Sequence, residues 1–143
     1  MKIIFTCIFL LTLGLASDKA DNIRIKILER IIGKLSLNEQ TRVWSDNKNI
    51  LNTLSQNSSL KTTPNCIYAN IIILQNQNKL PKECSSKAIF VLDYKLLSQI
   101  PQSFGAFFWK KGRPNIVILK PRIQKQSIKI SSGLKSYLEE KVW

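Results

Sequence analysis

Residues 103–119 form the densest apolar run after the N-terminal segment, and a short basic turn divides this run in two. Apolar side chains occupy both alternating sets of positions in Phe104–Trp109 and again in Ile116–Leu119. Such runs are typical of strands that are covered on both faces of a sheet. Lys111 and Gly112 lie at the apex, where a tight turn would give Gly112 a positive φ. The stretch therefore predicts a β-hairpin inside a sheet that has both faces covered.

The turn of this predicted hairpin and the segment after it are basic. All nine acidic residues lie outside Tyr94–Leu138, and the formal net charge of the chain is +13. A field of one sign favours an acidic protein, an anionic lipid surface or a nucleic acid as partner. A solvated, lysine-rich face is the alternative. The candidate partner-binding surface consists of Trp109, Lys110, Lys111, Arg113, Lys120 and Arg122.

Residues 1–16 have the layout of a secretory signal peptide. Lys2 precedes a mostly apolar segment, and Gly14 and Ala16 provide the small residues of a cleavage site before Ser17. A membrane anchor is the alternative, but the apolar segment is shorter than the roughly 20 residues that span a bilayer. We expect cleavage after Ala16 and export to the periplasm. The mature chain, residues 17–143, would then be a single domain without a transmembrane span.

Two cysteines remain in the expected mature chain, Cys66 and Cys84. An even number of cysteines in an exported protein favours a disulfide, and two buried, unpaired thiols are the alternative. Their spacing does not resemble a zinc ligand set, and the chain has no histidine. We therefore predict a Cys66–Cys84 disulfide and no metal site.

The rest of the sequence alternates between helix and strand patterns. Helices are predicted at 23–32, after Asp46, at 94–99 and at 122–126. A strand over 23–27 is the alternative to the first of these helices. A last helix is predicted after Ser131 or Ser132, with Leu134, Tyr137 and Leu138 on one face. Strands are predicted at 41–44, 60–63, 69–74 and 87–92 besides the hairpin, and 128–130 is predicted to be extended. Asp46 and Asp93 are interpreted as N-caps of the helices that follow them. This order predicts a single small α/β domain with a mixed sheet of about five to six strands and helices on both faces.

No set of residues suited to catalysis is recognisable in the sequence. Without histidine there is no ordinary catalytic triad, and the five glycines are isolated, so no phosphate-binding loop is formed. The carboxylates are scattered along the chain. We expect a protein that is not an enzyme and that uses no cofactor. A small anion bound at the strand ends near Ser45, Asp46, Asp93 and Tyr94 is an alternative function.

Three features of the C-terminal half occur together: a glycine-led apolar strand from Gly105, a Gly112-Arg113 turn, and the segment Ile128–Ser132 before the last helix. With the strand and turn of Thr41–Asp46 and the helix after them, they resemble the YfiR-type periplasmic proteins. The resemblance implies a small periplasmic α/β protein. It also implies a function, which is to bind and restrain the periplasmic portion of a membrane-bound diguanylate cyclase.

The leading hypothesis is therefore a periplasmic, non-catalytic regulatory or adaptor protein. Its partner would be a membrane-anchored signalling or envelope protein. One alternative is a module that binds a small anion, and another is a basic protein that binds DNA or anionic lipid through charge alone. Export argues against nucleic acid as the partner, and a homodimer is left open.

Overall fold

Two continuously apolar segments form the centre of the sheet, as predicted. β4 (Ile71–Leu74) and β5 (Ala88–Val91) pair in parallel, and nearly all of their residues are buried. Branched and aromatic side chains suit such strands, because they pack on both faces while the backbone groups pair within the sheet. The computed structural model describes residues 20–143. The predicted signal peptide, residues 1–16, lies outside the described residues.

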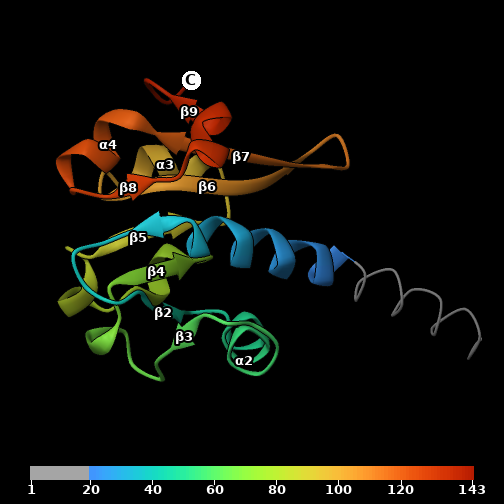
Figure 1. Cartoon of the computed structure of the whole chain (residues 1–143), viewed down its shortest axis with the longest axis vertical. Coiled ribbons are helices and arrows are strands. Elements are labelled where there is room, and N and C mark those ends of the chain that lie inside the picture. Colours follow the sequence, from blue (N-terminus) through green and yellow to red (C-terminus); the bar gives the residue numbers. More distant parts are fainter. Residues whose placement is uncertain (1–19) are drawn as a thin grey trace, which may run out of the picture.

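Within residues 20–143 the main sheet has seven strands in the order β3-β2-β4-β5-β6-β7-β9, which follow one another from bottom to top in Figure 1. The other strands are β2 (Arg42–Ser45), β3 (Lys61–Thr62), β6 (Ser103–Lys110), β7 (Arg113–Leu119) and β9 (Leu138–Glu139). The strands from β3 to β6 in this order are parallel, β7 is antiparallel to β6, and β9 is parallel to β7. The predicted mixed sheet is confirmed, with β9 as an additional strand.

Helices cover both faces of this sheet, as predicted. The helix over residues 20–33, α2 (Lys48–Asn57) and α4 (Lys120–Lys125) bury apolar side chains on one face. α3 (Lys95–Gln99) packs on the other face. Alternate residues of β4 belong to the two apolar cores, because successive side chains of a strand point to opposite faces.

A second, two-stranded sheet joins distant parts of the chain. β1 (Leu35–Ser36) directly follows the helix over residues 20–33 and pairs antiparallel with β8 (Lys129–Ile130). The backbone N–H of Ser131 also donates to the carbonyl of Lys34, at 3.2 Å. β8 lies within the segment predicted to be extended, whereas β1 is too short to show an alternating pattern.

Two helix predictions are wrong in detail. α2 is capped by Asn47 and not by Asp46, since the Asn47 side chain accepts a hydrogen bond from the Ile50 backbone N–H at 3.0 Å. The predicted last helix is η4 (Ser132–Tyr137), a 3-10 helix, and Leu138 belongs to β9. The glycine and serines of this segment have low helix propensity, and the strand pairing of Leu138 ends the helix after less than two α-helical turns.

Candidate functional site

The predicted hairpin forms, and its turn has the geometry expected of a two-residue connection. β6 and β7 pair in antiparallel register up to Lys110 and Arg113. Lys111 (φ 52°) and Gly112 (φ 74°) make the turn, so both residues adopt the left-handed conformation that this type of hairpin requires. Figure 1 shows the hairpin reaching out beyond the neighbouring strands.

Neighbouring strands support only the base of this hairpin. β5 pairs with β6 as far as Ala106, and β9 pairs with β7 only over its last residues. Residues 107–117 therefore form a two-stranded extension whose outer edges are unpaired within the described part of the chain, and we call it the basic arm. Trp109 is 43% exposed, and its ring meets the buried ring of Phe107 edge-on with 5.5 Å between centroids. The prediction of a covered hairpin holds for its base, and residues 109–113, which were expected to form a surface, are exposed.

The basic arm ends in three exposed cations, Lys110, Lys111 and Arg113. Among residues 20–143, none of them has a carboxylate within ion-pair distance. By contrast, Lys120 Nζ lies 3.9 Å from Glu140 Oε1. An exposed ion pair of this kind contributes little to the free energy of folding. The uncompensated charge of the predicted surface is thus concentrated at the tip of the arm.

Arg122 points toward the protein instead of toward solvent. Its guanidinium donates hydrogen bonds to the carbonyl oxygens of Leu97 (2.8 Å) and Ser103 (2.9 Å), and to Ser103 Oγ at 3.2 Å. Burial lowers the pKa of Arg122, because desolvation disfavours its charged form. We therefore assign Arg122 to the junction of α4 with α3 and β6 and leave it out of the binding surface.

Arg122→Met is expected to lower the free energy of unfolding by about 2 kcal/mol, because it removes a charged donor from partly buried carbonyl oxygens. Lys125→Met changes an exposed cation of the same helix and is the matched control, with an expected change within about 0.5 kcal/mol. Urea unfolding followed by circular dichroism measures both variants. Equal stability of the two would show that these hydrogen bonds do not hold α4 in place.

Aromatic side chains from distant segments gather beside the base of the basic arm. The rings of Tyr94 and Phe108 meet edge-on, with 5.0 Å between centroids. The backbone N–H of Trp143 donates to Tyr94 Oη at 2.9 Å, while the side chain of Trp143 is mostly exposed. Lys141 Nζ lies 4.4 Å from the centre of the Trp143 ring. Sequence reasoning missed this grouping, because nothing local connects residues 94, 108 and 143.

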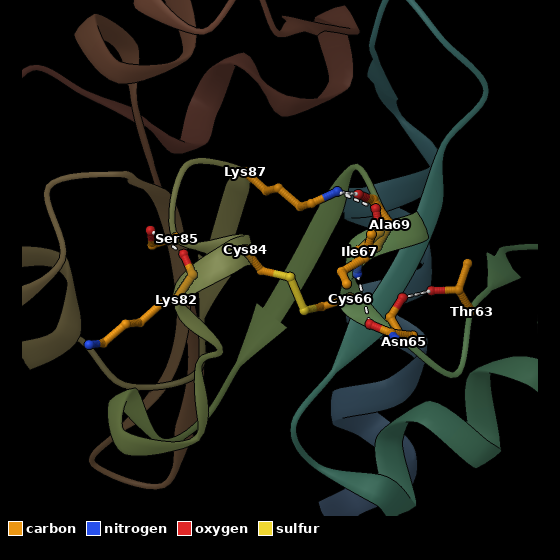
Figure 2. Close-up of a disulfide and its surroundings, with 9 residues drawn as sticks. All are labelled: Thr63, Asn65, Cys66, Ile67, Ala69, Lys82, Cys84, Ser85 and Lys87. Atoms are coloured by element: carbon orange, nitrogen blue, oxygen red, sulfur yellow. Dashed lines mark hydrogen bonds between the residues drawn. A yellow bond between two sulfur atoms is a disulfide. The ribbon is translucent and has the colours of Figure 1, made fainter.

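Cys66 and Cys84 form the predicted disulfide, which joins two short 3-10 helices (Figure 2). Cys66 begins η1 (Cys66–Tyr68), and Cys84 ends η3 (Lys82–Cys84). Figure 2 also shows Lys87, whose ammonium donates to the carbonyl oxygens of Ile67 and Ala69. The disulfide and this lysine together fix the segment that covers the α3 face of the sheet beside β4.

A hollow of about 730 Å³ lies at the carboxyl ends of β2 and β4, and we call it the strand-end hollow. Residues 46–49 form one wall, and residues 75–79, which include η2 (Gln77–Lys79), form the other. Leu96 and Gln99 of α3 complete the lining. Most of the lining side chains are amides, which can both donate and accept hydrogen bonds.

Asp46 joins the two walls of the strand-end hollow. Its Oδ1 accepts a hydrogen bond from the Gln75 backbone N–H at 2.8 Å, and its Oδ2 accepts one from that of Asn76 at 2.9 Å. Asn47 donates from its side-chain amide to Gln75 Oε1. These bonds connect the end of β2 to the end of β4, which explains why Asp46 does not cap α2.

The other residues of the predicted anion site do not converge on this hollow. Ser45 is buried, and its hydroxyl accepts from the Asn47 backbone N–H at 3.1 Å. Asp93 accepts from the Lys95 backbone N–H at 3.1 Å, in the first turn of α3. Tyr94 contacts the aromatic group beside the basic arm. Of the four predicted residues, Asp46 alone lines the hollow.

Within residues 20–143, no three metal-ligating side chains are grouped so that they could hold an ion. No helix in the same range is long and apolar enough to cross a membrane. A scan against protein-family models finds no match for the chain, and a search of curated proteins finds none either. The resemblance to the YfiR-type proteins therefore stays a prediction.

Proposed function

We propose that this protein is an exported, non-catalytic binding protein of the periplasm, which uses the basic arm to bind an acidic surface of a membrane-anchored partner. One observation supports this more than any other. Lys110, Lys111 and Arg113 are exposed at the turn of the hairpin, and none has a carboxylate within ion-pair distance among the described residues. Three neighbouring like charges repel one another, so their grouping does not stabilise the fold and favours a role in attracting a partner.

Two features of the basic arm favour a protein partner over a lipid surface or a nucleic acid. Trp109 is fixed against Phe107 but remains 43% exposed, and tryptophan and arginine are enriched at the centres of protein interfaces. The unpaired edges of the arm also offer backbone donors and acceptors to an extended segment of a partner. Attraction by charge alone would need neither feature.

The proposed location and partner rest on separate arguments. A disulfide such as Cys66–Cys84 persists in oxidising compartments, which supports export. The resemblance to YfiR-type proteins makes the periplasmic portion of a membrane diguanylate cyclase the first partner to test.

The test is a titration of that purified periplasmic portion against the wild-type protein and an arm variant. Lys110→Glu, Lys111→Glu and Arg113→Glu together are expected to weaken binding by about 10- to 100-fold, since each exposed ion pair contributes up to roughly 1 kcal/mol. Co-purification from solubilised envelopes, with and without the three changes, extends the test to partners other than the cyclase.

The matched control makes the same change of charge at exposed lysines outside the arm. Lys82→Glu, Lys129→Glu and Lys135→Glu should weaken binding by less than about threefold, because screening limits the reach of distant charges. Unchanged binding of the arm variant would refute the role of the arm. Salt-sensitive binding to DNA or anionic vesicles, without binding to any envelope protein, would point to a surface that acts by charge alone.

A further inference from the structure

The strand-end hollow lies where the topology of the sheet leaves a crevice. β2 and β4 are neighbours in the sheet. After β2 the chain forms α2 on one face of the sheet, whereas after β4 it continues to η3 with Cys84 on the other face. Open α/β sheets bind ligands at such a point, beyond the carboxyl ends of the strands. The volume of about 730 Å³ is within the usual range for ligand sites, roughly 300–1,000 Å³.

The walls of the strand-end hollow are held in place without a ligand. The Asp46 carboxylate binds the backbone of residues 75 and 76, and Asn47 both caps α2 and donates to Gln75. Asn76 Oδ1 accepts from the Asn78 backbone N–H at 3.0 Å, which fixes η2. A preformed site loses less conformational entropy when it binds, so even weak contacts can give measurable affinity.

The unengaged groups of the hollow define the chemistry of its ligand. Asn49, Gln77, Asn78 and Gln99 line it, and their side-chain amides have no hydrogen-bond partner among residues 20–143. Each amide offers donors and an acceptor at once, which matches hydroxyl groups because these also donate and accept. Asp46 is the one carboxylate among the lining residues, and each of its oxygens already accepts a backbone N–H, so the lining does not provide the several charged oxygens of a cation site.

The two lysines that line the hollow do not make it selective for an anion. Lys48 and Lys79 are exposed members of the lining, where flexible side chains hold a charge in bulk water. The N-terminus of α2 is already capped by Asn47, which leaves fewer free backbone donors for an anion. Leu96 also borders the hollow, but it is buried and offers a ligand little apolar surface.

From this arrangement we infer that the strand-end hollow binds a small, neutral, polyhydroxylated molecule of the saccharide class. The site shares no residue with the basic arm, so this inference does not depend on the proposed protein-binding function. The affinity is expected to be on the order of millimolar, because the hollow is open to solvent and its lining contains no aromatic ring.

Nuclear magnetic resonance titration of the full mature chain tests the inference with maltose, trehalose and N-acetylglucosamine as probes, and with phosphate and citrate as anionic comparisons. At least one saccharide should shift the side-chain amide signals of residues 78 and 99. Asn78→Ala with Gln99→Ala should weaken that binding by about tenfold, as expected for the loss of one or two hydrogen bonds. Gln124→Ala removes an exposed amide elsewhere and should leave the affinity unchanged.

Lys48→Ala together with Lys79→Ala distinguishes a saccharide site from an anion site. Saccharide binding that survives this double change supports the inference. Binding of phosphate or citrate that is lost with the lysines, in the absence of any saccharide response, would overturn it in favour of an anion site. An absence of shifts with all five probes would overturn it as well. Neither result would bear on the basic arm, whose variants leave the hollow intact.

Discussion

Phe90→Ala is expected to lower the free energy of unfolding by about 3–5 kcal/mol, which is the usual cost of removing a buried phenylalanine side chain. Phe90 lies in the middle of β5 and is fully buried. Its ring contacts that of Phe104, with 5.7 Å between centroids. A Cβ atom built on Gly105 would lie 3.0 Å from the Phe90 ring, so this ring packs against the backbone of the neighbouring strand β6. The truncation therefore leaves a cavity lined partly by backbone, which cannot easily move to fill it.

Urea unfolding measures this loss as a shift of the transition midpoint by about 2 M, given the usual denaturant dependence of about 1–3 kcal/mol per molar. Ile67→Ala is the control, because Ile67 is also a large apolar residue but is 52% exposed. Its effect should stay within about 0.5 kcal/mol. A loss below about 1 kcal/mol for Phe90→Ala would mean that the face of β5 that carries Phe90 is not packed as described.

Removal of the disulfide by Cys66→Ser with Cys84→Ser should cost about 3 kcal/mol in the free energy of unfolding. The bond joins residues separated by 18 positions, and it limits the conformations of the unfolded chain by closing this loop. Both cysteines are buried in the core on the α3 face, so the serine hydroxyls would also need partners there.

Reducing agent separates the contribution of the bond from that of the substitution. Dithiothreitol should destabilise the wild-type protein by a similar amount and should have no effect on the double serine variant. If the wild-type protein is equally stable with and without reductant, the disulfide does not contribute to stability under those conditions.

The sequence predicts the elements of this fold whose pattern is local. Both faces of residues 71–74 and 88–91 are apolar, and this pattern indicated buried strands correctly. The hairpin at Lys111-Gly112 was also predictable, because a two-residue turn with positive φ has a characteristic sequence. Strands of two residues, such as β1 and β9, have no period to detect, and only their partners elsewhere in the chain define them.

The candidate sites were less predictable, because long-range contacts decide the direction of each polar side chain. Asp46 and Asn47 are both suitable caps for α2, and Asn47 takes that role because Asp46 binds the backbone 29 and 30 residues later. Arg122 looks like its basic neighbours in sequence, but carbonyl oxygens from α3 and β6 draw it inward. The exposure of the cations of the basic arm was easier to predict than the contacts of Asp46 and Arg122, since a turn at the end of a hairpin leaves its side chains exposed.

The ladder between β1 and β8 determines when the domain can finish folding. The helix over residues 20–33 precedes β1, but its apolar side packs in the same core as Ile128 and Leu134. That side is therefore covered only in part until nearly the whole chain has been synthesised. Contacts between such distant residues form slowly, because the intervening chain must first lose conformational freedom. A delay of this kind suits the proposed export, since a chain that has not yet closed can still be threaded through a membrane channel.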